Sequence, residues 1–425
     1  MLKFNKLYRL KYVYIIKERV SVMKKWYMIP VVLLLSVFLT ACIKIEFEKP
    51  GATEETMQET IESPVEDAAV QETEVSAEAP LDQTDQAEDS PYAAQGTCGL
   101  NAVWTVDKNG HLTISGVGDM YDGWRIADEM TQNGGDVWDS DSWEHQIYSI
   151  EIQQGITLIG EDAFCFCDKA TEVSLPDGLE EIGARAFSGG VFQEIVLPDS
   201  LLEIGEEAFY DTALTHVTLP HSVEKIGLYA FRGGAIQNIY VAEDNEDFAS
   251  VYGCLYSKDQ TVLLQCPRYR RGVVQVAEGT KTIAKGAFAD CWFVTQIDIP
   301  SSITNIEAGA FYSCNELKSI EVSDGSNYKI IDGMLYHSPT MTLVYCPSGA
   351  AKDVVVPNGT KIIDSYALQD SELWSVTIPS SVEVIEEEAF GWNLTAPIHY
   401  EGTWDAWQKI VIRDSNVLSV SVYTK

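Results

Sequence analysis

Residues 197–209 read LPDSLLEIGEEAF, and this stretch decides the fold because the chain repeats its pattern eight times. Counted from the position of Pro198, an isoleucine stands six residues later, an alanine ten residues later, and a phenylalanine or leucine eleven residues later. The isoleucines are Ile159, Ile182, Ile204, Ile226, Ile283, Ile306, Ile363 and Ile385. The last position holds Phe164, Phe187, Phe209, Phe231, Phe288, Phe311, Leu368 and Phe390. This regularity indicates an array of stacked units, because no single unit of this size could bury its own isoleucine and phenylalanine.

Successive phenylalanine or leucine positions lie 23, 22, 22, 57, 23, 57 and 22 residues apart. A period near 22 is too short for a pair of helices and fits one strand, a turn and an irregular return, as in leucine-rich repeats. Aliphatic residues alternate before the reference position, as Val217 and Leu219 do before Pro220, which is typical of a half-buried strand. The sequence therefore predicts a mainly β repeat solenoid of the leucine-rich-repeat type over residues 149–396, with one short strand per 22–23-residue repeat.

The two 57-residue intervals contain extra segments that match each other. Residues 253–256, GCLY, correspond to residues 333–336, GMLY. Each extra segment is predicted to form a hairpin inside the solenoid, with its turn near residues 258–259 or 338–339. Residues 397–425 are predicted to close the array as a C-terminal cap made of a strand, a short helix with two tryptophans, and further strands.

Residues 96–148 are predicted to form the N-terminal β cap that an open solenoid needs. Within them, Trp104 and Val106 in residues 102–106, and Leu112 and Ile114 in residues 111–116, stand two positions apart on either side of Asn109-Gly110. An Asn-Gly pair between two such segments favours a hairpin whose turn uses positive φ angles. The buried face of this hairpin is expected to hold Trp104, Val106, Leu112 and Ile114.

Residues 1–41 are predicted to be an export signal. Lys24 and Lys25 precede an uncharged run of 16 residues, 26–41, which is short for a membrane span and typical of a signal peptide. The run ends in LTAC, which resembles the box of a bacterial lipoprotein signal and implies lipidation of Cys42. A plain signal peptide, or an N-terminal anchor with an incidental cysteine, is the alternative. Met23 is a second candidate for the true start.

Residues 42–95 are predicted to be a lipid-anchored, acidic, disordered linker. From residue 43 onward they hold fifteen acidic residues against Lys44 and Lys49, so they lack the apolar surface that folding requires. An acidic tail that binds a partner is the alternative. The whole chain has 29 basic and 64 acidic residues and a net charge of −35, which argues against nucleic acid and anionic lipid surfaces as partners.

The unit in residues 197–209 resembles the BspA-like class of bacterial leucine-rich repeats. The two matching hairpins, the opening segment 96–116 and the closing segment 400–407 are also similar to that family. The resemblance covers residues 96–425. It implies a cell-surface protein used in binding or adhesion, it implies no catalytic residues, and it does not identify a ligand.

The remaining chemistry of the sequence predicts no catalytic site, no metal site and no cofactor. No nucleophile motif, phosphate-binding glycine loop or CxxC pair is present. Among the cysteines, Cys98 is the one most compatible with a disulfide. The acidic residues around His145 are interpreted as a solvated loop, and a cation site is the alternative. Buried, unreactive thiols are expected at Cys167, Cys266, Cys291, Cys314 and Cys346.

The predicted function is non-catalytic binding of an extracellular protein or glycan by a lipoprotein on the outer face of a bacterial cell membrane. Strand alternation sends one residue outward for each aliphatic residue sent inward, and solenoids use such extended surfaces for partners. Binding through the hairpin insertions, a structural or self-associating envelope spacer, and a wall-active enzyme are the alternatives. The candidate ligand-binding residues are Glu172, Ser174, Glu194, His216, Thr218, Gln296, Asp298, Ser375 and Thr377.

Overall fold

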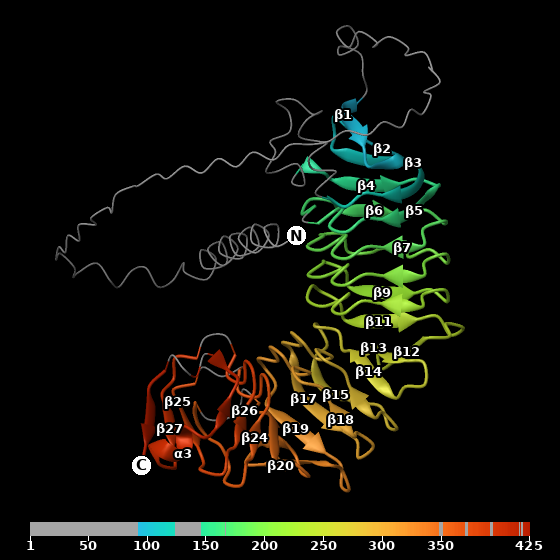
Figure 1. Cartoon of the computed structure of the whole chain (residues 1–425). Helices are drawn as coiled ribbons and strands as arrows, with labels where there is room; N and C mark the ends of the chain where they lie inside the picture. The colour runs from blue at the N-terminus through green and yellow to red at the C-terminus, as the bar shows by residue number, and fades with distance from the viewer. Residues whose placement is uncertain are drawn as a thin grey trace, which may run out of the picture. The chain divides into compact units, whose positions relative to one another are not determined.

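The structure is a computed structural model, which describes residues 92–123, 146–165, 167–347, 352–369, 373–391, 394–415, 417 and 420–425. The predicted signal peptide, Cys42, the linker up to residue 91, and the acidic residues around His145 lie outside the described residues. Residues 81–425 belong to one compact unit. Its described part is a mainly β solenoid of about 11 turns, each stacked on the one before it, which confirms the predicted fold class (Figure 1).

The first strand of each turn follows the alternation seen in the sequence. In β9 (His216–Leu219), Val217 and Leu219 are buried while His216 and Thr218 are exposed. β9 pairs in parallel with β11 (Asn238–Val241), which sets Val217 beside Ile239. The other first strands are β4 (Ser149–Ile152), β6 (Glu172–Ser174), β15 (Gly272–Gln275), β17 (Val294–Ile299), β19 (Ser319–Val322), β23 (Asp353–Val355), β25 (Ser375–Ile378), β27 (Ile398–Tyr400) and β29 (Val422–Thr424).

Each turn also contains a second strand, whereas the sequence predicted only one strand per repeat. The repeat isoleucine ends this strand in a regular repeat, and the isoleucines pair from turn to turn, as Ile204 does with Ile226. Two residues are too few to show an alternation in the sequence. The second strands are β5 (Ile156–Ile159), β7 (Glu181–Ile182), β8 (Glu203–Ile204), β10 (Lys225–Ile226), β14 (Val262–Gln265), β16 (Thr282–Ile283), β18 (Asn305–Ile306), β22 (Thr342–Tyr345), β24 (Ile362–Ile363), β26 (Val384–Ile385) and β28 (Val411–Ile412).

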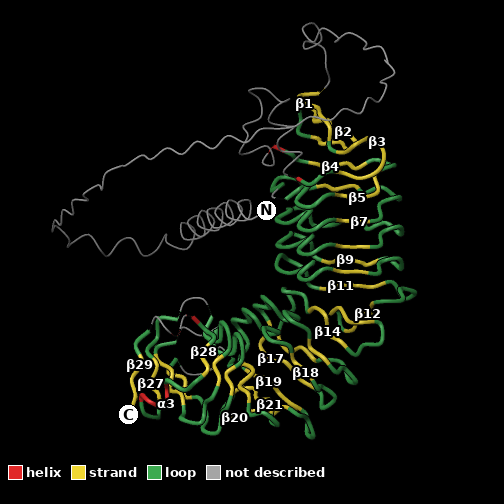
Figure 2. The backbone as a smooth tube through the Cα atoms, in the orientation of Figure 1, coloured by secondary structure: helices red, strands yellow, loops and turns green. Residues whose placement is uncertain are grey.

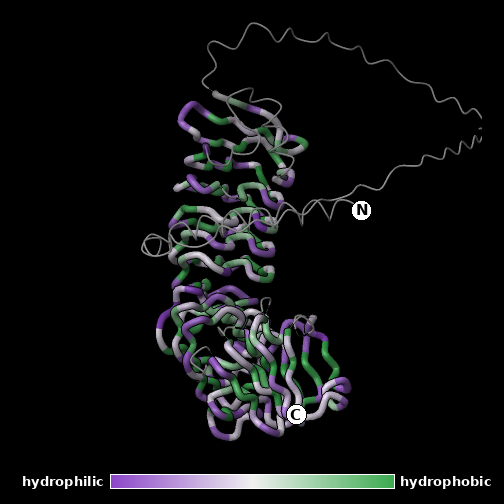
Figure 3. The backbone as a smooth tube through the Cα atoms, turned by 90° about the vertical axis from the view of Figure 1, so that its left-hand side faces the viewer, coloured by the Kyte–Doolittle hydropathy of each residue, from purple (hydrophilic) through white to green (hydrophobic). Residues whose placement is uncertain are grey.

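The repeat phenylalanines form a stack along the core. The ring centroids of Phe164, Phe187, Phe209 and Phe231 are separated by 5.3, 5.6 and 5.6 Å in succession, and each ring is almost completely buried. The backbone N–H groups of Phe164, Phe187 and Phe209 donate to the carbonyl of the repeat alanine in the next turn, as Phe187 does to Ala208 at 2.9 Å. Buried aromatic rings and satisfied backbone groups therefore join each turn to the next. Figure 3 shows apolar and polar segments alternating along the turns.

The N-terminal end is closed by β1 (Tyr92–Thr97), β2 (Gly99–Asp107) and β3 (His111–Met120), which pair antiparallel in that order. β3 then pairs in parallel with β4 and β5 and thereby joins both sheets of the array. Residues 92–95 lie in β1, so the chain is ordered ahead of the predicted linker boundary at residue 95, because these residues pair with β2. The four side chains expected in the buried face are all buried, as predicted: Trp104, Val106, Leu112 and Ile114.

The turn of the cap hairpin differs from the predicted one. Gly110 has a φ of 75°, whereas Asn109 does not have a positive φ. The Asp107 side chain instead accepts hydrogen bonds from the backbone N–H groups of Asn109 and His111, at 2.8 and 2.9 Å. A carboxylate that bonds its own backbone two residues later is a common way to stabilise a turn.

Each extra segment forms a three-stranded antiparallel unit inside the solenoid (Figure 2). In the first, β12 (Phe248–Val251) pairs with β13 (Cys254–Ser257), which pairs with β14. In the second, β20 (Tyr328–Ile331) and β21 (Met334–His337) pair in the same way ahead of β22. β14 and β22 then join the second sheet in parallel with β16 and β24. The hairpins expected from the sequence are present, whereas β12 and β20 were not predicted.

The C-terminal end contains the short helix α3 (Trp404–Trp407). The Thr403 side chain caps it by accepting a hydrogen bond from the Ala406 N–H at 3.3 Å. Trp407 is buried with its ring centroid 5.2 Å from that of Tyr400, whereas Trp404 is exposed. Among the described residues, no helix has the length and apolar character needed to cross a membrane.

The structure contains no disulfide bond among the eight described cysteines. Those expected to be buried, Cys167, Cys266, Cys291, Cys314 and Cys346, are buried. Cys98 is completely buried and forms no disulfide, and burial raises the pKa of its thiol to about 12. A buried thiol with a raised pKa is a poor nucleophile, so Cys98 packs as a small apolar side chain.

Candidate binding surfaces

The outward residues of the first strands form a surface that we call the strand face. In β9 the exposed positions are His216 and Thr218, and in β6 they are Glu172 and Ser174. In β17 and β25 the corresponding residues are partly exposed: Gln296, Asp298, Ser375 and Thr377. The candidate ligand-binding residues on these strands thus lie outside the core, on the side opposite the aliphatic residues.

Strand register brings these residues together in columns within each block of paired strands. Glu172 lies beside Ser149 and Ser174 beside Glu151, and Thr218 lies beside Tyr240. Two further columns are Gln275, Asp298 and Glu321, and Val355, Thr377, His399 and Tyr423. The Asp353 carboxylate accepts a hydrogen bond from the Ser375 hydroxyl at 2.6 Å.

The columns do not form one continuous sheet, which is a correction to the expected arrangement. Glu194 is exposed but lies in no strand, so the first sheet is interrupted between β6 and β9. The two extra segments separate β11 from β15 and β19 from β23, because their strands extend the second sheet and not the first. The strand face therefore consists of separate blocks, each two or more strands wide.

The strand face combines exposed apolar and aromatic side chains with polar ones. Val196 is 84% exposed and Val355 is 60% exposed, although valine side chains are usually buried in folded proteins. Tyr423 is also exposed, and its ring stacks on His399 with centroids 5.3 Å apart. Exposed tyrosine and valine beside short hydroxyl side chains are typical of a surface that contacts a protein or a sugar.

Sequence reasoning missed a second surface, which arises where the extra segments enter the array. In a regular repeat, four residues separate Ile204 from Phe209. In the first extra segment, Leu263 pairs as the isoleucine does, and Cys266 donates its N–H to Ala287 as the repeat phenylalanine does. Only two residues separate Leu263 from Cys266, so the loop is two residues shorter there. The second extra segment repeats this arrangement with Leu343 and Cys346.

The regular loop projects because its residue two positions before the phenylalanine has a positive φ in all eight repeats. These residues are Asp162, Arg185, Glu207, Tyr229, Gly286, Gly309, Tyr366 and Glu388. Since the shortened turns lack this loop, a gap opens in the row of loops at each extra segment. Tyrosines extend across the gaps: a Cβ added at Gly286 would overlap the Tyr229 ring, and one at Gly309 would lie 3.1 Å from the Tyr366 ring.

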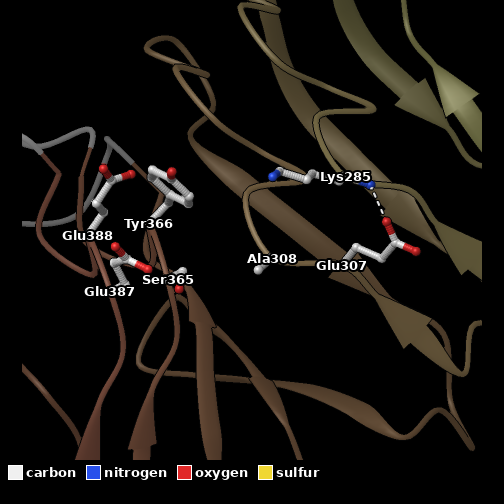
Figure 4. Close-up of a pocket in the computed structure, with 7 residues that line it drawn as sticks. All are labelled: Lys285, Glu307, Ala308, Ser365, Tyr366, Glu387 and Glu388. Carbon is white, nitrogen blue, oxygen red and sulfur yellow. Dashed lines mark hydrogen bonds between the residues drawn. The ribbon is translucent and has the colours of Figure 1, made fainter. Parts of the chain in front are cut away.

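Two neighbouring depressions occupy these gaps. The first is a cavity of about 250 Å³ whose lining includes Leu228, Phe248 and Leu264. The second has a volume of about 360 Å³ and is shown in Figure 4. There Lys285, Glu307 and Ala308 face Ser365, Tyr366, Glu387 and Glu388 across the opening (Figure 4). Lys285 and Glu307 line both depressions, so the two are adjacent, and together we call them the paired notch.

An arginine of the chain bridges the first gap. The Arg232 Nε donates to the Asp290 carboxylate at 2.7 Å, and both side chains are largely buried. Its guanidinium carbon lies 4.6 Å from the Tyr229 ring centroid and 5.0 Å from that of Tyr312, within the range of cation–π attraction. Tyr312 in turn contacts Tyr366 edge to face, with centroids 5.4 Å apart. The spacing of 57 residues was the signal in the sequence that could have indicated these gaps.

The family model of the BspA type leucine-rich repeat region matches six copies, over residues 142–254, 273–352 and 345–401. Together these ranges cover more than half of the chain. A search of the curated proteins found no match.

Several solved structures resemble the chain at low sequence identity. A leucine-rich repeat protein from Eubacterium ventriosum is 21% identical, with a TM-score of 0.52 over 77% of this chain and 95% of that one. A leucine-rich cell surface protein from Faecalibacterium prausnitzii is 21% identical, with a TM-score of 0.45 over 76% and 99%. The pneumococcal vaccine antigen PcpA is 19% identical, with a TM-score of 0.46 over 79% and 100%. The likeness to the Eubacterium ventriosum protein supports the solenoid fold.

Proposed function

Since the chain belongs to the BspA-type leucine-rich repeat proteins, we propose that it is a non-catalytic surface lipoprotein whose strand face binds an extracellular protein or glycan. The observation that carries the proposal is the strand register, which sets exposed apolar, aromatic and polar residues in columns. Repeat arrays commonly use such an extended surface for partners. The PcpA and Faecalibacterium proteins are described as a vaccine antigen and a cell surface protein, which is in keeping with exposure outside the cell.

The charge of the chain narrows the class of partner. A net charge of −35 disfavours nucleic acids and other polyanions, since like charges repel at the distances of binding. The columns mix acidic, neutral and aromatic side chains, for example Asp298 with Gln275 and Thr377 with His399. A neutral or basic partner that offers hydrogen-bonding groups next to apolar ones therefore suits the strand face.

The N-terminal sequence supports the location. LTAC at residues 39–42 follows an uncharged run and a basic pair, and lipidation of Cys42 would hold the array on the outer face of the membrane. Residues 43–91 would then form the tether between the anchor and the first strand at Tyr92. Repulsion among their acidic side chains favours an extended tether, which would place the strand face at a distance from the lipid.

The binding surface is tested by comparing the strand face with a hairpin. Partners are first captured with the full chain from host matrix, from mucus and from the bacterium's own wall. His216→Glu and Glu194→Lys on the face are expected to weaken binding of the captured partner roughly tenfold, because each changes the charge and the hydrogen-bonding groups that the face presents to the partner. Lys258→Glu, near the tip of the first hairpin, is the control and is expected to bind like the parent.

Two outcomes contradict the proposal. Weakening by Lys258→Glu alone, with all three variants melting like the parent, would place the site on the hairpin and not on the strand face. Failure to capture any partner while the purified chain self-associates would favour a structural envelope spacer instead.

A further inference from the structure

We propose that the paired notch is a second binding site, which takes an extended peptide segment carrying one apolar side chain and, within a few residues, a lysine or arginine. The site is made by the loops at the two gaps and not by the strand face. It therefore goes beyond the proposed function and can be tested separately from it.

The acidic half of the notch favours a cation. Three carboxylates, those of Glu307, Glu387 and Glu388, line it against the one ammonium group of Lys285. Glu307 already accepts a hydrogen bond from the backbone N–H of Lys285 at 2.7 Å. The side of the opening that holds Glu387 and Glu388 therefore carries the excess negative charge, and Figure 4 shows both beside Tyr366.

The chain itself shows which group this kind of site accepts. At the first gap, Arg232 lies against the rings of Tyr229 and Tyr312 and pairs with the carboxylate of Asp290. Arg232 directly follows its repeat phenylalanine, and the corresponding residue before the second gap is Tyr312. The second gap thus has the Tyr366 ring and the carboxylates of Glu387 and Glu388. At the position where the first gap has Arg232, however, it has Tyr312. A guanidinium or ammonium group from a partner would find a similar pair of groups there, the Tyr366 ring and the Glu388 carboxylate, although these two residues stand at other repeat positions than Tyr229 and Asp290.

The other half of the notch favours an apolar side chain. Leu228 is 43% exposed, and Phe248 and Leu264 beside it are only partly buried. The cavity volume of about 250 Å³ is enough for one large aliphatic or aromatic side chain. Burial of such a group would remove exposed apolar surface on both partners, which is the main source of affinity at small interfaces.

The two halves are close enough for one short segment to fill both. They share Lys285 and Glu307, so an apolar and a basic side chain must lie within a few residues of each other on the ligand. An extended chain advances about 3.3 Å per residue, so a spacing of two to four residues spans neighbouring depressions. A neutral sugar or a lipid chain would match one half only and leave the other without a partner.

The test uses the full chain in a polyoxyethylene detergent and a fluorescein-labelled hexapeptide with the sequence glycine, leucine, glycine, glycine, arginine, glycine. Binding is measured by fluorescence polarisation. Glu387→Gln, Glu388→Gln and Leu228→Ser are each expected to raise the Kd roughly tenfold, and added salt is expected to weaken binding by the parent. Replacing the arginine or the leucine of the peptide by serine is expected to have a similar effect.

Matched controls come from a regular repeat. Glu206 and Glu207 occupy the same repeat positions as Glu387 and Glu388, and Glu207 and Glu388 have nearly the same φ, 55° and 56°. Glu206→Gln and Glu207→Gln are expected to leave the Kd unchanged. His216→Glu on the strand face is also expected to leave peptide binding unchanged.

Three results would overturn the inference. The first is an equal change of the Kd in the notch variants and the control variants. The second is an unchanged Kd for the peptide that lacks its arginine, and the third is no detectable peptide binding by a chain that still binds its captured partner through the strand face. The last result would contradict only the inference about the paired notch and would leave the proposed function of the strand face intact. Binding of the peptide, without capture of any partner, would contradict only the proposed function of the strand face. Each variant is included only if its melting temperature matches that of the parent.

Discussion

Phe209→Ala is expected to lower the free energy of unfolding by about 3–5 kcal/mol, the range for truncating a fully buried aromatic side chain. Phe209 is 1% exposed and stacks between Phe187 and Phe231, with centroids 5.6 Å away on either side. Its removal leaves a cavity in the middle of the stack. Because repeat arrays are stabilised by nearest-neighbour contacts, the loss weakens the joints on both sides of the turn.

The measurement is urea unfolding followed by circular dichroism, with Glu206→Ala as the matched control. Glu206 lies three residues before Phe209 in the same loop and is exposed, so its truncation is expected to change the free energy of unfolding by less than about 0.5 kcal/mol. If both variants shifted the urea midpoint equally, the assignment of these positions to core and surface would be wrong.

Cys42→Ser is expected to remove the chain from the membrane fraction, the largest functional effect of any single substitution considered for it. Burial of an acyl chain in lipid contributes about 0.8 kcal/mol per methylene group, so two chains on one cysteine hold a protein firmly where one does not. Serine cannot form the thioether through which the lipid is attached.

Metabolic labelling with radioactive palmitate and cell fractionation test this prediction together. The parent is expected to take up label and sediment with membranes, and Cys42→Ser is expected to do neither. Cys98→Ser, which alters a buried cysteine of the folded part, is the control and is expected to keep the label. Label on Cys42→Ser in the membrane fraction would refute the proposed anchor.

The core was predictable from the sequence because it depends on a repeated one-dimensional pattern. Ile204, Ala208 and Phe209 recur at fixed spacing, and each lies almost completely buried. The cap hairpin was predictable in the same way, since Trp104 and Val106, and Leu112 and Ile114, stand two positions apart on either side of a turn. Both extra hairpins were predictable because GCLY at 253–256 and GMLY at 333–336 match.

The features that were not predictable depend on short segments or on contacts between distant turns. A second strand of two residues, such as Lys225–Ile226, is defined by its neighbour and has no pattern of its own. The 57-residue spacing indicates where the gaps lie, but the paired notch also requires knowing that Cys266 occupies the place of a phenylalanine, which the hydrogen bond to Ala287 reveals. The contact of Arg232 with Asp290 joins residues 58 apart across an extra segment, and no local signal in the sequence indicates it.

The candidate ligand-binding residues illustrate the same division. Alternation was enough to predict that His216 and Thr218 point away from the core, and they do. It could not show that the first sheet breaks into blocks, because two breaks arise from strands that join the other sheet and one arises where a repeat has no first strand. Glu194 follows the repeat register but lies in no strand, so it extends the strand face as a loop residue.

Hydrogen exchange of the full chain, with and without its captured partner, tests most directly the claim that the strand face is the binding surface. If the strand face binds the partner, the partner is expected to slow the exchange of backbone amides in the first strands, such as β9, β11, β25 and β27. Amides near residues 258–260 and 338–340, at the hairpin turns, are predicted to exchange at the same rate in both states. Slowed exchange at these turns, with no change in the first strands, would contradict it.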